Sequence, residues 1–166
     1  MFDTFGEFDS AEEINKAAAG QLAQGDTQAV RDIARENGLD SADAEDYIAG
    51  DVTELCNPLM AALGKLKIEK TDLEIKGVLE DWYDIVIDVC TNDEKVRAAV
   101  RRKDKSLKVF MSKVLARAFD TKELISNKII EITKVKDGKE NMRGPVYLGI
   151  PNRTEIKKMC NEYYLK

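Results

Sequence analysis

The side chains that could do chemistry here are carboxylates, lysines, arginines, tyrosines and three cysteines, because the sequence contains no histidine. Without imidazole, the chain cannot build a Ser-His-Asp or Cys-His catalytic arrangement, or a zinc site that needs histidine. The sequence also lacks the GxxxxGK[ST] and GxGxxG phosphate-binding motifs. Cys56, Cys90 and Cys160 are too few for a four-cysteine zinc site, and we interpret them as core residues.

One catalytic alternative remains, a metal-dependent nuclease built on Asp84 and Asp88. Two carboxylates without a positioned basic or nucleophilic partner do not specify a reaction. The sequence therefore predicts a protein that is not an enzyme and that uses no cofactor and no metal.

Charge is distributed unevenly along the 166 residues, whose net charge is −5. Residues 1–60 carry 14 acidic and 3 basic residues, a net charge of −11, whereas residues 61–166 carry 17 acidic and 23 basic residues, a net charge of +6. Such an asymmetry indicates a polar partner, or contact between the two halves. We expect an acidic N-terminal helical region over residues 1–66 and a helical core over residues 67–166, in one continuous domain.

Positive charge is concentrated in the stretch 99–119, AVRRKDKSLKVFMSKVLARAF, which holds seven basic residues and one acidic residue. A helical wheel places six of its apolar residues on one buried face, with cations on both flanks. The cluster RRKDK at 101–105 falls at the junction of two helices. Its charges favour an anionic partner, whether nucleic acid, an acidic protein patch or the chain's own N-terminal half. The residues of the buried face are Leu107, Phe110, Met111, Val114, Leu115 and Ala118.

Two surfaces of opposite sign are therefore candidates for partner binding. The segment 29–50 has the rhythm of a helix-turn-helix, but its second helix is acidic and would repel DNA. The expected helix over residues 70–90 has a broad apolar face with carboxylates opposite. The acidic candidates are Asp40, Asp43, Glu45, Asp46, Asp51, Asp81, Asp84 and Asp88. The alternative, nucleic-acid-binding candidates are Arg97, Arg101, Arg102, Lys103, Lys105, Lys108 and Lys113.

Helical periodicity with capping residues runs through most of the chain. The β-branched and turn-forming residues near the C-terminus predict a hairpin pairing roughly 130–136 with 145–149 across Lys136-Asp137-Gly138. A last helix follows Pro151-Asn152. The predicted fold is mainly α (α+β): a compact bundle of about seven to eight helices with a small C-terminal β-hairpin and a final helix.

Nothing in the sequence predicts a membrane location. The apolar runs are shorter than a membrane span requires, and the acidic opening MFDTFGEFDSAEE lacks the features of a secretion signal. We expect a cytoplasmic protein with no membrane contact.

Four stretches together carry a family resemblance: MFDTFGEFDSAEEINKAA, LCNPLMAALGKL, AAVRRKDKSL and LGIPNRTEIKKMCNEYYL. The chain resembles small proteins of phages and integrative elements of gut Firmicutes that belong to a Cas9-inhibitor, or anti-CRISPR, family. The resemblance implies a non-enzymatic inhibitor that binds a CRISPR effector or its guide-RNA complex and blocks DNA binding or cleavage. It assigns no role to any individual residue. The alternative is a DNA- or RNA-binding accessory protein of such an element, using the basic segment 97–117.

Overall fold

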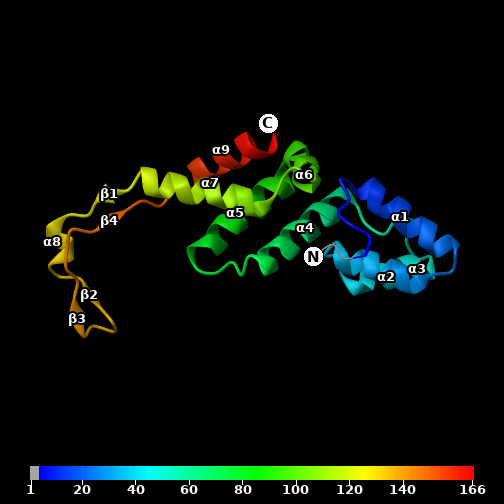
Figure 1. Cartoon of the computed structure of the whole chain (residues 1–166), viewed down its shortest axis with the longest axis horizontal. Coiled ribbons are helices and arrows are strands. Elements are labelled where there is room, and N and C mark those ends of the chain that lie inside the picture. The colour runs from blue at the N-terminus through cyan, green and yellow to red at the C-terminus, as the bar shows by residue number, and fades with distance from the viewer. Residues whose placement is uncertain (1–3) are drawn as a thin grey trace.

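The computed structural model describes residues 4–166, and these form nine helices and four two-residue strands (Figure 1). The mainly α prediction, with a small hairpin followed by a final helix, is confirmed. The helix beyond the predicted seven or eight is a four-residue segment, Asn127–Ile130, within the C-terminal hairpin region.

The N-terminal part is a packed group of three short helices, α1 (Ala11–Ala23), α2 (Thr27–Glu36) and α3 (Ser41–Ala49). The side chains of Ser10 and Asp26 each accept a backbone N–H three residues on, which starts α1 and α2 as their types predict. Their buried side chains are mainly small or aliphatic, so the helices lie close together. This first core includes Ile14, Ala18, Val30, Ile33, Ala44, Tyr47, Leu55 and Ala61.

The second core lies among five helices: α4 (Pro58–Asp72), α5 (Val78–Asn92), α6 (Glu94–Arg101), α7 (Leu107–Asp120) and α9 (Arg153–Tyr164). These helices contribute larger aliphatic and aromatic side chains than the first group. Pro58 is in the first turn of α4, where its missing N–H leaves no bond unmade. The second core includes Leu66, Trp82, Val86, Cys90, Phe110, Val114, Ile156, Cys160 and Tyr164.

Helix α4 belongs to both cores, because Ala61 is buried in the first and Ala62 in the second. The end of α2 crosses α4 so closely that a Cβ added at Gly64 would collide with the backbone carbonyl of Asn37. Gly38, which follows, has a positive φ of 70°. This backbone crossing fixes the N-terminal helices against the rest of the molecule.

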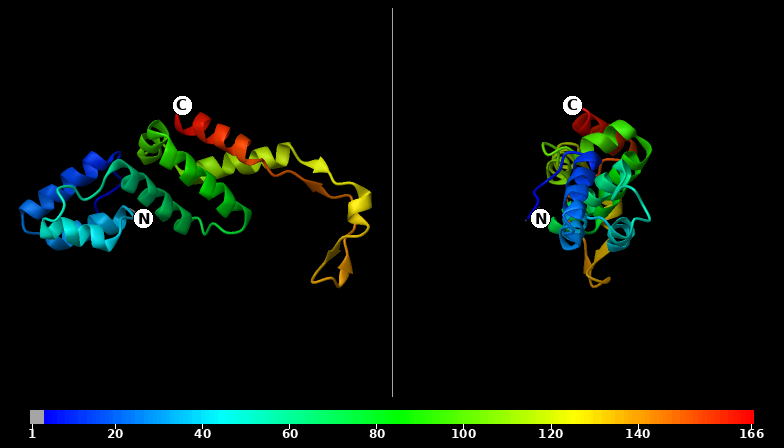
Figure 2. Two further views of the ribbon diagram at one scale, coloured as in Figure 1. Left: turned by 180° about the vertical axis from the view of Figure 1, so that it is seen from behind. Right: turned by 90° about the vertical axis from the view of Figure 1, so that its right-hand side faces the viewer.

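Residues 121–150 form an arm that leaves the helices after α7 and returns to them at α9 (Figures 1 and 2). Strand β1 (Glu123–Leu124) pairs with β4 (Tyr147–Leu148), and β2 (Lys134–Val135) pairs with β3 (Glu140–Asn141). Both ladders are antiparallel, and the short helix α8 (Asn127–Ile130) lies between them along the arm.

The turn of the predicted hairpin is confirmed, but its pairing is wrong. Lys136, Asp137 and Gly138 have positive φ angles and reverse the chain as expected. The segment 145–149 pairs with β1 instead of 130–136, because α8 takes up the start of the expected strand. The periodicity of β-branched residues did not distinguish a short helix from a strand here.

One residue of the expected α7 face is also misplaced. Five of the six residues are buried, but Leu115 is 48% exposed. The apolar face on the helical wheel is wider than the face of α7 that is buried, because α7 packs against only part of α4 and α9.

Candidate functional site

Five carboxylates form an acidic cluster around α3 and the loop that leads into α4. Within residues 4–166, none of the five makes an ion pair. Three of them line one surface hollow of about 290 Å³. The acidic cluster consists of Glu12, Asp43, Asp46, Asp51 and Glu54.

Cys56 lies beneath this cluster and is 2% exposed. Burial, reinforced by the charges of Glu54, Glu12 and Asp43, raises the pKa of the Cys56 thiol to about 12. The thiol therefore stays protonated at neutral pH and is not a nucleophile. Burial likewise raises the pKa of Cys90 to about 11 and that of Cys160 to about 12. All three cysteines are free and buried, as expected of core residues.

Two of the predicted acidic residues near the cluster are engaged by cations. Arg31 pairs with both carboxylate oxygens of Glu45, at 2.6 and 3.0 Å, and lowers the pKa of that carboxyl. Lys67 Nζ lies 3.0 Å from Asp40 Oδ1. Asp43, Asp46 and Asp51 therefore remain as the predicted residues of this region without a cation beside them.

The acidic residues predicted on α5 form a separate surface. Figures 1 and 2 both show α5 well away from α3 along the length of the molecule. Asp81 and Asp84 are exposed, whereas Asp88 accepts from Arg153 at 2.9 Å and from Lys157 at 2.6 Å. Those two cations lower the pKa of Asp88. The structure thus does not bring the eight predicted carboxylates into one patch.

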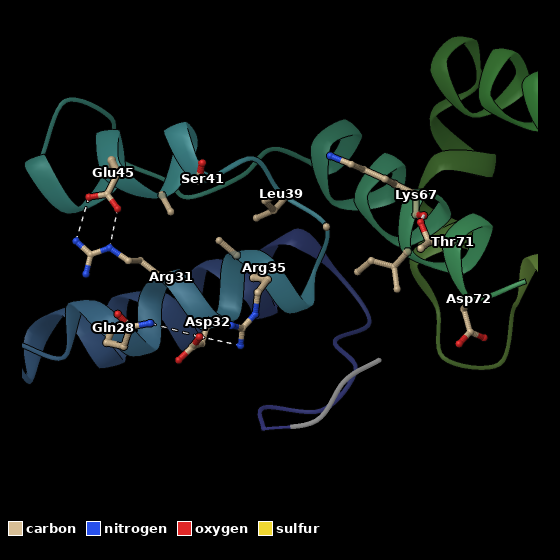
Figure 3. Close-up of a pocket in the computed structure, with 14 residues that line it drawn as sticks. Gln28, Arg31, Asp32, Arg35, Leu39, Ser41, Glu45, Lys67, Thr71 and Asp72 are labelled. Atoms are coloured by element: carbon tan, nitrogen blue, oxygen red, sulfur yellow. Dashed lines mark hydrogen bonds and ion pairs between the residues drawn. The ribbon is translucent and has the colours of Figure 1, made fainter. Parts of the chain in front are cut away.

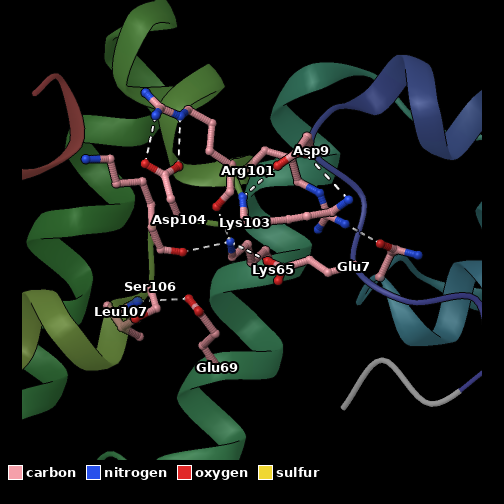
Figure 4. Close-up of polar contacts among 12 residues, drawn as sticks. Glu7, Asp9, Lys65, Glu69, Arg101, Lys103, Asp104, Ser106 and Leu107 are labelled. Atoms are coloured by element: carbon pink, nitrogen blue, oxygen red, sulfur yellow. Dashed lines mark hydrogen bonds and ion pairs between the residues drawn. The ribbon is translucent and has the colours of Figure 1, made fainter.

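The basic junction contacts the acidic N-terminal half of the same chain (Figure 4). Lys65 Nζ lies 2.6 Å from Glu7 Oε1, and Lys103 Nζ lies 3.5 Å from Asp9 Oδ2. The Lys103 backbone N–H also donates to Asp9 Oδ1 at 2.7 Å and lowers the pKa of that carboxyl. We call Glu7, Asp9, Lys65, Arg101 and Lys103 the charged seam.

Arg101 is also almost fully enclosed in the seam, with 2% of its surface exposed. Its guanidinium donates to the side-chain oxygen of Asn37 and, at 3.4 Å, to the carbonyl of Ala61. Burial lowers the pKa of Arg101, and the nearby charge of Glu7 opposes that shift. Arg101 therefore joins the end of α2 to α4 and α6 and does not face solvent.

Lys105 is also inside the molecule, 8% exposed, and donates to the backbone carbonyl of Tyr163 at 2.9 Å. Lys65 Nζ donates to the backbone carbonyls of Arg102 and Lys105, at 2.7 and 2.8 Å. The backbone of the basic junction therefore also binds a cation of the seam. Arg101 and Lys105 were predicted to bind nucleic acid from the surface. The structure instead buries both side chains. Their long side chains satisfy backbone and side-chain acceptors inside the fold.

The other predicted basic residues differ in whether the fold already provides them with a hydrogen-bond or ion-pair partner. Arg102 forms a two-pronged pair with Asp104, and Arg97 donates to the carbonyls at the end of α5. Lys103 belongs to the seam. Lys108 and Lys113 on α7 are exposed and make no ion pair within residues 4–166.

Glu69 completes the polar contacts beneath the junction, and its carboxylate accepts the Leu107 backbone N–H at 3.1 Å (Figure 4). This bond starts α7 next to α4. Burial raises the pKa of Glu69, with the bond from Leu107 and the charge of Lys65 opposing the shift.

An apolar groove of about 620 Å³ runs between α2, the start of α3 and the second half of α4 (Figure 3). Ala34, Leu39, Ala44 and Ile68 provide its apolar lining. The Arg31–Glu45 pair lies at one end of the groove, and Thr71 and Asp72 lie at the other. The sequence analysis did not find this groove, because it arises from three helices that do not share a motif.

Other functional candidates were missed for specific reasons. Lys65, between the buried Ala62 and Leu66, occupies a core position of α4, and a lysine there signals an internal partner. Glu12 and Glu54 both lie near Cys56, and only the folded chain brings the two together there. Glu7 and Asp9 precede the first helix and carry no periodic signal.

No group of three or more cysteines or carboxylates in residues 4–166 is arranged to hold a metal ion. In the same part of the chain, no helix combines the length and apolar content needed to cross a bilayer. No protein-family model, curated protein or solved structure matches the chain.

Proposed function

We propose that this is a non-enzymatic, cytoplasmic protein of a mobile genetic element that inhibits a Cas9-type effector by binding it through the acidic cluster. The observation that carries the proposal is the acidic cluster itself. Three of its five carboxylates line one hollow and none of the five makes an ion pair within residues 4–166, while most of the basic residues have internal acceptors.

The chemistry of the target supports this assignment. Cas9-type effectors hold nucleic acid in positively charged channels and read the motif beside the target with arginines. Carboxylates held at the end of a rigid helical protein compete for those cations and keep DNA out. The exposed Asp81 and Asp84 offer a second, separate acidic contact for the same partner. The family resemblance points in the same direction.

The test is a DNA-cleavage assay with a purified guide-loaded type II effector and increasing amounts of the protein. We expect inhibition, and a complex whose dissociation constant rises with salt. Removing three charges of the cluster should weaken binding by about tenfold or more, since close charge pairs across interfaces are each worth over 1 kcal/mol in favourable cases. The variant is Asp46→Asn/Asp51→Asn/Glu54→Gln, which leaves the first turn of α3 intact.

The matched control removes three carboxylates elsewhere and should leave inhibition unchanged. A control that weakens inhibition equally would show that only net charge matters. An absence of binding to the type II effectors of the host range would overturn the proposal. The control variant is Asp120→Asn/Asp137→Asn/Glu162→Gln.

The alternative function, nucleic-acid binding by the basic segment, now depends on Lys108 and Lys113. It predicts a salt-sensitive gel shift of DNA or RNA by the protein alone, reduced by Lys108→Ala/Lys113→Ala. A flat gel shift at low salt would exclude this alternative.

A further inference from the structure

The arm, residues 121–150, is rich in apolar side chains but buries almost none of them. Ile130 is the only buried side chain between residues 121 and 150. Each ladder of the arm is two residues long, and a short two-stranded ladder is marginal in water without a packing partner.

Large apolar side chains lie exposed on the first ladder of the arm and around α8. Ile132 is 81% exposed, and five further apolar residues of the arm are 53–56% exposed. Phe119, at the base of the arm, is 64% exposed. Exposed apolar side chains gathered on one segment of a protein mark an interaction surface. The exposed residues of the arm are Leu124, Ile129, Ile132, Tyr147, Leu148 and Ile150.

A second copy of this chain offers a groove whose lining holds equal numbers of cations and carboxylates, within a segment that is acidic overall. Residues 121–150 carry six basic and four acidic residues, whereas residues 26–54, which include α2 and α3, carry two basic and nine acidic residues. The groove between α2, α3 and α4 is apolar at its base and has room for several side chains. Two arms packed on each other would instead bring together surfaces of the same sign.

The shape of the molecule sets the symmetry of such a contact. The arm lies at one end of the long axis and α2 and α3 lie toward the other, so a chain does not fill its own groove (Figures 1 and 2). Two copies related by a two-fold axis and running in opposite directions bring each arm to the groove of the other copy. Such an isologous pair makes the contact twice and closes, which is the commonest oligomeric arrangement.

We propose that the protein is a two-fold dimer in which the arm of each copy docks in the α2–α3–α4 groove of the other. The docked arm buries its exposed isoleucines, and its lysines approach the acidic N-terminal helices. This dimer does not depend on the proposed inhibition of an effector, because it involves this chain alone.

Sedimentation equilibrium of the full chain across a range of concentrations tests the dimer. We expect a transition from the 18.6 kDa monomer to twice that mass. Ile129→Glu/Ile132→Glu, the arm variant, should raise the dimer dissociation constant at least tenfold, since it places two unpaired charges in the apolar centre of the interface. The matched control, Val109→Glu/Leu165→Glu, makes the same changes at exposed positions outside the arm and should leave the constant unchanged.

A groove variant distinguishes the two ways in which arms could associate. Gln28→Arg/Thr71→Arg places bulk and positive charge at exposed positions of the groove and should weaken the dimer as strongly as the arm variant. Mixing the arm variant with the groove variant should restore a heterodimer, because one arm and one groove of that pair are intact. Circular dichroism of each variant checks that the helices remain formed.

Several outcomes would overturn the proposal. One is a monomer at hundreds of micromolar protein in low salt. Another is a groove variant that dimerises normally, with no recovery on mixing, because that result would place arm against arm. A third is a monomer whose arm variant loses a DNA or RNA gel shift, which would assign the arm to nucleic acid.

Discussion

The charged seam and the arm differ in composition and in burial, each in the direction opposite to what its residue types suggest. The seam contains five ionisable residues, yet Lys65 and Arg101 are almost fully buried within it. The arm is rich in isoleucine, leucine and tyrosine, yet nearly all of these side chains face solvent. At the seam, charge is buried inside the fold, and on the arm, apolar side chains are left exposed.

The difference teaches that residue type alone does not reveal which surface is available to a partner. Long cations can reach acceptors across a helix crossing, and the crossing of α2 with α4 supplies several of them. An isoleucine in a two-residue ladder has no neighbouring layer to cover it. The following predictions test this contrast, from the largest expected change in unfolding free energy to the smallest.

The tightest point of the seam region is Gly64, and Gly64→Ala should have the largest effect. The added methyl group meets the backbone carbonyl of Asn37, which cannot rotate away as a side chain would. We expect a loss of about 3 kcal/mol or more in unfolding free energy, at the upper end for overpacking. Urea denaturation followed by the fluorescence of Trp82, the single buried tryptophan, measures it.

Gly20→Ala is the matched control for that change, since Gly20 is helical and nothing lies within 4 Å of an added Cβ. Alanine there should stabilise the protein by about 0.5–1 kcal/mol. Equal effects of the two substitutions would contradict the close crossing at Gly64.

The buried cation of the seam, Lys65, should matter far more than an exposed cation of the same helix. Lys65→Met leaves the Glu7 carboxylate and two backbone carbonyls without their donor, a loss of about 3 kcal/mol. Lys67→Met breaks the exposed pair with Asp40 and should cost under about 1 kcal/mol. Thermal melts of both variants give the comparison, and a Lys65 variant as stable as wild type would contradict an internally satisfied seam.

The buried carboxyl of Glu69 should give the protein a characteristic pH dependence. Because the fold raises its pKa, rising pH ionises Glu69 in the unfolded chain before it does so in the folded protein. This residue's contribution to stability therefore falls as pH rises from the ordinary carboxyl pKa of about 4.3 through the raised value.

Glu69→Gln removes that contribution while keeping an oxygen to accept the Leu107 N–H. The stability of the wild type relative to the variant should increase as pH is lowered toward 4, in denaturation curves measured between pH 4 and 7. A pH-independent difference would show that Glu69 titrates normally in the fold.

The arm should give the smallest change in stability. Ile132→Ser removes an apolar side chain that already faces water, so the unfolding free energy of the monomer should change by less than about 0.5 kcal/mol. The measurement uses protein dilute enough to be monomeric. A loss of about 2 kcal/mol would mean that the helices of the same chain cover the arm.

Helix positions followed from local chemistry and could be predicted closely. Asp93 and Ser106 cap α6 and α7, and Asn152 forms a capping box with Glu155, as their types and spacing indicate. The apolar face predicted for α5 is core from Trp82 to Cys90, but that helix begins only at Val78, which is 43% exposed. The strand pairing could not be predicted, because two-residue ladders leave almost no periodic signal.

The candidate site was predicted only in part. Asp43 and Asp46 line one surface hollow, but Glu54 joins them there, and Glu12 comes near Cys56, only in the folded chain. The sequence left three anionic partners open for the basic junction, and the chain's own N-terminal half was one of them. The sequence contained no means of choosing among them, since all three are anionic.

By itself, the sequence determined the helices and their caps, the absence of imidazole chemistry and the opposite charges of the two halves. These depend on residue type and short-range spacing, which act over one or two helical turns. Only the tertiary structure decided that Arg101 and Lys105 are enclosed, that the isoleucines of the arm are exposed and that a groove separates α3 from α4. Burial depends on which elements meet, and those contacts join residues that lie tens of positions apart in the chain.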